Sequence, residues 1–127
     1  MLHEMMLREQ PFRKIVSGYK TIELRLLDEK RQKLKEGDQI RFINQDAPRE
    51  SICVSVKKLH AFSDFAELYR ALPLDRCGYL PEELPTASPE DMNAYYSVQR
   101  QAQYGVLGIE IERIGCGRET DERQSEG

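Results

Sequence analysis

The stretch Gly18-Tyr19-Lys20-Thr21-Ile22-Glu23-Leu24-Arg25 decides the fold of this chain of 127 residues. Over residues 21–27 apolar and polar side chains alternate, which predicts a β-strand. One face of that strand is apolar and belongs in a core. Glu23 and Arg25 stand two apart, so they point together from the opposite face. The segment thus predicts a core strand that presents a carboxylate and a guanidinium side by side.

A helix and a tight turn are expected just before this strand. Pro11 suits the first position of a helix over residues 11–17, where Phe12, Ile15 and Val16 form an apolar stripe. Gly18 adopts a left-handed backbone conformation at little cost, so it predicts the end of that helix. Lys20 then lies at the turn between helix and strand.

The rest of the chain continues as short strands and helices that do not alternate regularly. Strands are predicted near Met5 and Leu7 and over residues 39–44, 51–59 and 104–111, helices over 63–72 and 88–101, and an irregular segment over 73–87. Ser63 is the expected N-cap of the first helix, and Ser88, with the acid Asp91 at N3, is the expected cap of the second. This order disfavours a doubly wound parallel sheet. It favours an α+β fold, namely a small mixed or antiparallel β-barrel with two or three flanking helices. We expect one domain over residues 1–114 and a flexible C-terminal tail over residues 115–127.

Composition narrows the class of protein. Apolar residues make up 39% and charged residues 32% of the chain, as in globular proteins. No apolar run approaches the roughly 18 to 20 residues of a membrane span, and the opening residues lack a secretory signal pattern. We therefore expect a cytoplasmic protein without a membrane partner. The cysteines and histidines lack the paired spacings of metal sites, and no nucleotide-cofactor loop is present, so neither a metal nor a cofactor is predicted.

Charge is distributed unevenly along the chain. The net charge is −3, but residues 1–60 hold 13 Lys and Arg against 9 Asp and Glu, a balance of +4. Residues 61–127 hold 6 against 13, a balance of −7. A local basic face is therefore compatible with an acidic chain, and local potential is what a phosphate backbone meets. The alternative is that the basic residues of 30–35 only keep a loop solvated.

The candidate site is the cluster Gly18, Lys20, Glu23 and Arg25. A planar guanidinium and an ammonium suit a phosphate or carbonyl group, and the carboxylate can orient either cation or accept from a base amino group. Tyr96 is a candidate stacking surface for a base, as are Tyr95 and Tyr104. Helical spacing favours a core role for at least one of these tyrosines. The simpler alternative for Glu23 and Arg25 is a surface ion pair of little energetic value.

The pattern G-x-K-x-x-E-x-R formed by these four residues resembles the signature of the ASCH domain family, a branch of the PUA-like β-barrels. The helix at 11–17, the segment 35–42 and the strand at 104–109 are also similar to that family, so the resemblance covers residues 5–114. It implies a barrel with a cleft beside the motif strand. In the family that cleft is proposed as a site for RNA or for a nucleotide-like ligand.

The resemblance also raises an enzymatic alternative. Some small bacterial relatives hydrolyse acylated cytidine nucleosides with a lysine, a threonine and a glutamate. Lys20 matches the lysine, but Glu23 occupies the place of the threonine. The first hypothesis is therefore an RNA- or nucleotide-binding module. The second is a hydrolase, either an N4-acetylcytidine-type amidohydrolase or a ribonuclease, with Lys20 and Glu23 as catalytic residues. The third is a protein-interaction module.

Overall fold

The computed structural model describes residues 1–115 of the chain. Its strands are β1 (Leu2–Leu7), β2 (Ile22–Leu26), β3 (Gln39–Asn44), β4 (Ser51–Phe62) and β5 (Val106–Ile114). Its α-helices are α1 (Glu9–Val16), α2 (Phe65–Ala71) and α3 (Val98–Tyr104). The short 3-10 helix η1 (Arg31–Lys33) lies between β2 and β3, and η2 (Leu84–Thr86) and η3 (Pro89–Ala94) lie between α2 and α3. The predicted tail at 115–127 falls, except for Gly115, outside the described residues. No helix of the described part is long and apolar enough to cross a membrane.

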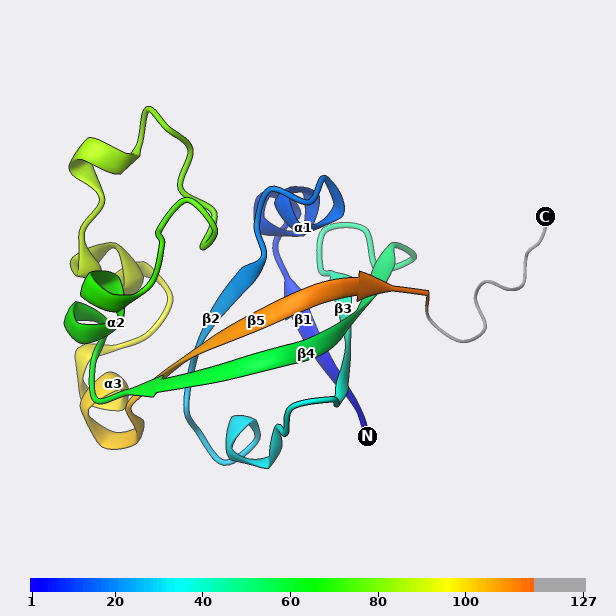
Figure 1. Ribbon diagram of the computed structural model, residues 1–127, viewed down its shortest axis with the longest axis horizontal. Coiled ribbons are helices and arrows are strands. Elements are labelled where there is room, and N and C mark those ends of the chain that lie inside the picture. Colours follow the sequence, from blue (N-terminus) through cyan, green and yellow to red (C-terminus); the bar gives the residue numbers. More distant parts are fainter. Residues whose placement is uncertain (116–127) are drawn as a thin grey trace.

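The five strands form one curled sheet in the order β1-β3-β4-β5-β2. The pair β1–β3 is parallel, and the other neighbouring pairs are antiparallel. A register shift between Val56 and Lys58 interrupts the β4–β5 pairing, and such irregularities bend a sheet. Helices α2 and α3 gather at one end of the long β4 and β5 strands, with α1 at another side of the sheet (Figure 1). The predicted α+β class, with a mixed sheet and three helices, is confirmed.

Two apolar clusters form the core. The larger one lies between α1 and the sheet, where Phe12 and Ile15 of the helix pack on residues such as Phe42 and Val54. The smaller one joins β2 to α2 and contains Ile22, Leu24 and Leu26, the face predicted to be apolar. The apolar face of β2 therefore belongs to the smaller cluster.

The two outer strands of the sheet, β1 and β2, are joined by a side chain. Arg25 of β2 donates from Nη2 to the carbonyl oxygen of Met6 in β1, at 2.7 Å. Lys30 donates to the next outward carbonyl of β1, that of Glu4, at 2.6 Å. Cationic side chains thus occupy acceptors that an edge strand otherwise leaves open to another chain.

Several predicted boundaries change in the structure. The single helix predicted over residues 88–101 is wrong: η3 ends at Ala94, and Ser97 caps a separate helix, α3, by accepting from the backbone N–H of Arg100. The predicted cap itself is present, since Ser88 and Asp91 form a reciprocal capping box. Asp64 rather than Ser63 caps α2, because its carboxylate accepts from the backbone N–H of Glu67.

The other strand limits also shift. Strand β4 runs three residues beyond the predicted end at Leu59, to Phe62. Tyr104 closes α3 instead of opening the last strand, because Gly105, with φ of 74°, redirects the chain there.

Replacing Leu68 by alanine tests the packing between α2 and β2. Leu68 is fully buried (0% exposed), so Leu68→Ala removes apolar contacts and leaves a cavity. We expect a loss of about 2–5 kcal/mol in the free energy of unfolding, measured by urea denaturation. Leu84→Ala is the matched control, since Leu84 is 39% exposed and should change stability by less than about 0.5 kcal/mol. Equal effects of the two substitutions would contradict this packing.

Candidate functional site

The turn after α1 places Lys20 at the start of β2. Gly18 has φ of 85°, the left-handed conformation predicted for it. The backbone N–H of Lys20 donates to the carbonyl of Lys14 in α1. The next two backbone N–H groups, of Thr21 and Ile22, both donate to the carbonyl of Arg76. The beginning of β2 is therefore tied to α1 on one side and to the segment after α2 on the other.

Glu23 lies buried between two cations. Its Oε1 is 2.9 Å from Nζ of Lys20, and its Oε2 is 2.6 Å from Nε of Arg25. Glu23 is only 3% exposed, and the side chains of Lys20 and Arg25 are 11% and 12% exposed. The predicted alternative of a weak surface ion pair therefore does not describe this arrangement.

The two cations keep Glu23 ionised despite its burial. Burial alone opposes ionisation, but the charges and hydrogen bonds of Lys20 and Arg25 outweigh it and lower the pKa of Glu23 to about 2. For Arg25, burial likewise opposes the charged form, and the charge of Glu23 outweighs it and raises the pKa of the guanidinium. The trio is thus one carboxylate and two cations at neutral pH.

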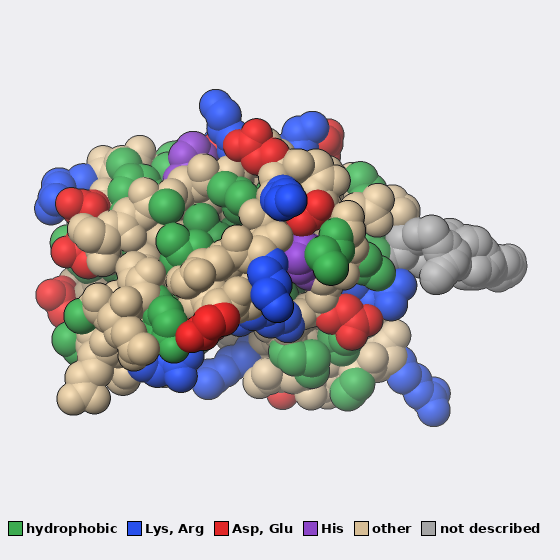
Figure 2. Space-filling model, turned by 90° about the horizontal axis from the view of Figure 1, so that it is seen from below, with side chains coloured by type: hydrophobic (Ala, Val, Ile, Leu, Met, Phe, Trp, Pro, Cys, Tyr) green, Lys and Arg blue, Asp and Glu red, His purple; other side chains and the backbone are tan. Residues whose placement is uncertain are grey.

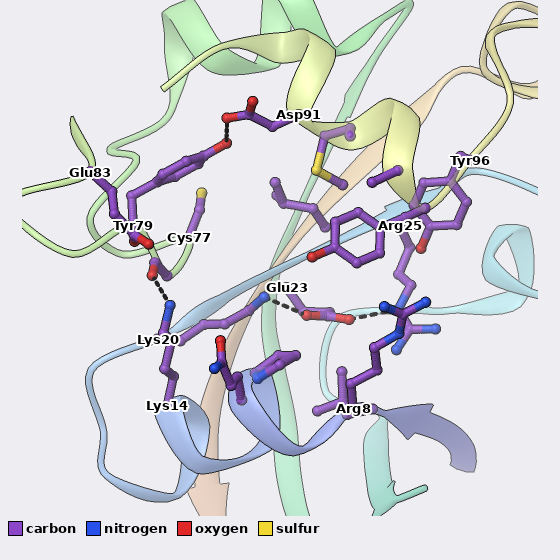
Figure 3. Close-up of a pocket in the computed structure, with 18 of the residues that line it drawn as sticks. Arg8, Lys14, Lys20, Glu23, Arg25, Cys77, Tyr79, Glu83, Asp91 and Tyr96 are labelled. Carbon is purple, nitrogen blue, oxygen red and sulfur yellow. Dashed lines mark hydrogen bonds and ion pairs between the residues drawn. The ribbon is translucent and has the colours of Figure 1, made fainter. Parts of the chain in front are cut away.

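A cleft of about 450 Å³ opens above this trio. Its lining comes from the end of β1, helix α1, strand β2, helix α2, the segment around residue 78 and helix η3. Glu23 lies in the middle of the close-up, with Arg8 and Lys14 on one side of it and Tyr79 and Asp91 on the other (Figure 3). A pocket of this size is in the range that holds a small organic ligand.

The structure brings most of the predicted site residues together. Lys20, Glu23, Arg25 and Tyr96 all line the cleft. Tyr96 also stacks on Phe65 of the core, with ring centroids 6.3 Å apart and an interplanar angle of 16°. Gly18 shapes the turn and is not part of the cleft lining.

Other lining residues were not anticipated from the sequence. Arg8 lies at the cleft with its guanidinium over the ring of Tyr95, at 5.5 Å. Lys14 reaches from α1 to donate to the carbonyl of Gly78, at 2.7 Å. Tyr79 donates to Asp91, at 2.7 Å. Asp91 was recognised from sequence only as a helix cap, and no local pattern marked the others.

Gly78 gives the Lys20 side chain its room. Its φ is 113°, and a Cβ at this position would lie 3.3 Å from Cδ of Lys20. A side chain here would therefore be strained in its backbone and crowded against one of the two cations that hold Glu23.

Metal ligation is not indicated around the cleft. Within residues 1–115 no group of three or more His, Cys, Asp and Glu side chains is arranged to hold a metal ion. The chemistry of the cleft is instead that of fixed charges and hydroxyl groups.

The curled mixed sheet, its flanking helices and the cleft beside β2 define a PUA-like α+β domain. The sequence model of the ASCH domain matches residues 5–115. The chain therefore belongs to the ASCH domain family, as its motif predicted.

Two solved archaeal structures are similar to this chain. The hypothetical protein PH0355 is 34% identical, with a TM-score of 0.74 over 90% of this chain and 100% of that one. Protein PF0455 from Pyrococcus furiosus is 32% identical, with a TM-score of 0.66 over 90% of this chain and 98% of that one. No curated protein matches the chain.

Replacing Glu23 by glutamine tests whether the buried carboxylate holds the trio together. Glu23→Gln leaves Lys20 and Arg25 close together without their shared anion. We expect a loss of about 3–5 kcal/mol in the free energy of unfolding near neutral pH, measured by urea denaturation. Glu112→Gln is the matched control, because Glu112 forms an exposed ion pair with Lys57; this change should cost less than about 1 kcal/mol.

The difference in unfolding free energy between the wild type and Glu23→Gln should depend on pH. The folded pKa of Glu23, about 2, lies below the ordinary value of about 4.3. Its contribution to stability is therefore fully present above about pH 4.3 and is lost as the pH falls through about 2. The gap in unfolding free energy between wild type and Glu23→Gln should shrink by about 3 kcal/mol over that window. A gap independent of pH would contradict an ionised Glu23.

Proposed function

We propose that this ASCH domain binds single-stranded RNA and takes one nucleotide into the cleft above Glu23. ASCH and PUA-like domains generally bind RNA. The observation that carries the proposal for this chain is the buried, ionised Glu23 held between Lys20 and Arg25 on the floor of a cleft of about 450 Å³. The following arguments support it.

The floor supplies fixed donors for an anionic or carbonyl oxygen. An ammonium has three N–H donors and a guanidinium has five, so the bonds to Glu23 use only some of those on Lys20 and Arg25. Because Glu23 accepts from both, it holds the two cations at defined positions and lowers the cost of ordering them when a ligand binds. Arg8 and Lys14 add positive charge along the α1 side of the cleft.

Aromatic side chains supply the complementary surface for a base. Four tyrosines, Tyr69, Tyr79, Tyr95 and Tyr96, line the cleft. Tyr95 lies at the mouth and is 57% exposed. Single-stranded RNA is commonly held by stacking of unpaired bases on such rings together with contacts to the backbone.

A hydrolase is less well supported by the same residues. A carboxylate with a pKa of about 2 is a weak base at neutral pH, so Glu23 is poorly suited to activate water. Thr21 is not part of the lining, and its hydroxyl accepts from Nε of Arg76. Burial raises the pKa of the Cys77 thiol to about 11, which keeps the sulfur protonated and a poor nucleophile.

Among the described residues, the face of the domain seen from below has no broad basic surface that would bind RNA (Figure 2). Basic, acidic and hydrophobic side chains are interspersed over the face seen from below (Figure 2). On this face there is neither a continuous basic track for a nucleic acid nor a large apolar patch for a protein. For RNA recognition we propose the cleft rather than this face.

The proposal predicts salt-dependent binding of RNA that depends on cations of the cleft. The double substitution Arg8→Gln with Lys14→Gln removes two cations and leaves both partners of Glu23 in place. Fluorescence anisotropy with a labelled single-stranded RNA should show binding weakened about three- to tenfold. The slope of log K against log salt should fall by about 1.4 if each cation meets one phosphate.

Lys57→Gln is the control for loss of charge outside the cleft, since Lys57 pairs with Glu112 on the surface. It should leave the affinity within about twofold. Equal losses from the cleft and the control substitutions, or a wild-type protein that binds no RNA, would contradict the proposal.

The hydrolase alternative is tested by a separate activity assay. We expect no release of acetate from N4-acetylcytidine and no cleavage of a labelled RNA by the wild-type protein, because Glu23 is a weak base and Thr21 lies outside the cleft. Both can be followed by liquid chromatography. Turnover that disappears in Glu23→Gln, with folding checked by circular dichroism, would overturn this expectation and establish an enzyme.

A further inference from the structure

Tyr69, Tyr79 and Asp91 form a chain of hydrogen bonds in the lining of the cleft. Tyr79 and Asp91 lie across the cleft from Arg8 and Lys14 (Figure 3). The hydroxyl of Tyr79 donates to Oδ2 of Asp91, at 2.7 Å. The hydroxyl oxygens of Tyr69 and Tyr79 are also 2.7 Å apart. All three side chains line the cleft.

The carboxylate fixes the direction of this chain. An ionised aspartate only accepts hydrogen bonds, and a tyrosine hydroxyl has a single proton to donate. Since Tyr79 donates its proton to Asp91, its oxygen must accept from Tyr69. Tyr69 therefore donates its single proton to Tyr79 and has none left to donate to a ligand. The hydroxyl oxygens keep only lone pairs for a ligand, so this wall accepts hydrogen bonds and donates none from these groups.

The arrangement is held on several sides. Oδ2 of Asp91 also accepts from the backbone N–H of Ser88 in the capping box. The hydroxyl of Tyr19 donates to the carbonyl of Tyr79, at 2.6 Å, and fixes the segment that carries it. The rings of Tyr69 and Tyr79 meet edge to face, with centroids 5.9 Å apart. A ligand therefore meets this wall already formed.

Both hydroxyls stay protonated at neutral pH, as this direction requires. Burial raises the pKa of Tyr69 to about 12. Burial and the hydrogen bond that Tyr79 donates to Asp91 also raise the pKa of Tyr79. Neither group becomes a phenolate that would change the pattern.

The cleft is thus polarised, with donors on one side and acceptors on the other. The donors are the ammonium group of Lys14 in α1, that of Lys20 in the turn before β2, and the guanidinium of Arg25 in β2. Tyr69, Tyr79 and Asp91 accept from α2, the following segment and η3. A ligand that fits both sides carries an oxygen-rich anionic group at one end and N–H donors at the other.

We propose that this acceptor wall makes the cleft selective for nucleobases that carry an amino group, so that cytosine is preferred over uracil. This rests on the proposed RNA-binding function. Cytosine presents an N4 amino donor where uracil presents the O4 acceptor. The amino group can donate to the wall, whereas the uracil oxygen would face lone pairs and leave polar groups unsatisfied on both sides. Asp91 acts as a positioning residue, because it sets the direction in which Tyr79 donates.

The test compares two RNA probes of equal length and charge, hexacytidylate and hexauridylate, by fluorescence anisotropy. For the wild-type protein we expect hexacytidylate to bind about tenfold more tightly than hexauridylate. This is the effect of one hydrogen bond that cytosine makes to the wall and uracil does not. Two substitutions should reduce this ratio to less than about threefold. Tyr79→Phe frees Tyr69 to donate toward the ligand, and Asp91→Asn replaces a pure acceptor by an amide that can also donate.

Matched controls separate this role from loss of structure. Tyr104→Phe removes a hydroxyl that donates to Glu29 outside the cleft lining, and Glu90→Gln changes an acid next to Asp91 that is also outside it. Both should keep the wild-type ratio. Because the readout is a ratio between two probes on one protein, a moderate loss of stability does not mimic the expected result. If either Tyr79→Phe or Asp91→Asn prevents folding, the affinity ratio of the other variant still tests the proposal.

The outcomes distinguish the two proposals. If the wild-type protein binds neither probe, the proposed function fails and the selectivity falls with it. If it binds both equally, RNA binding stands and the selectivity is overturned. A tenfold preference that persists in both Tyr79→Phe and Asp91→Asn would overturn the role of this wall.

Discussion

The buried carboxylate of Glu23 is the constraint on which this site depends. A carboxylate taken out of water is costly unless cations and hydrogen bonds compensate it. Here Lys20 and Arg25 each approach one of its oxygens. Arg25 also donates to the carbonyl of Met6 and so joins β2 to β1, the two outer strands of the curled sheet. The trio therefore positions the cleft floor, and Arg25 within it also connects the two outer strands of the sheet.

The cleft follows from where the chain places its irregular segments. Strand β2 supplies the floor, α1 supplies cations, and the long excursion between α2 and α3 supplies Tyr79 and Asp91. Hydrogen bonds of Tyr19 and Lys14 to the carbonyls of Tyr79 and Gly78 hold that excursion against the rest of the domain. The donors and acceptors of the cleft thus come from separate parts of the sequence, and their contrast exists only in the folded protein.

Much of the fold could be predicted from the sequence because its signals are local. The alternation around Ile22 and Leu24, the turn at Gly18 and the cap at Ser88 depend on neighbouring residues, and each is found in the structure. The break of the last predicted helix was missed because helical spacing continues through it, although Ser97 suits an N-cap and accepts from the backbone N–H of Arg100. Lys20, Glu23 and Arg25 were found through their motif. Tyr79 and Asp91 were not, because no sequence pattern shows that they face the motif strand.

A nuclear magnetic resonance titration of the labelled protein with hexacytidylate tests the central claim, that the ionised Glu23 trio is the floor of an RNA-binding cleft. The side-chain signals of Arg25 Nε, Lys20 Nζ and the Glu23 carboxyl carbon would be followed together. The account predicts that all three shift and saturate with added RNA, while the signal of Lys57, outside the cleft, stays in place. Saturating shifts on another face of the domain, with these three signals unchanged, would contradict it.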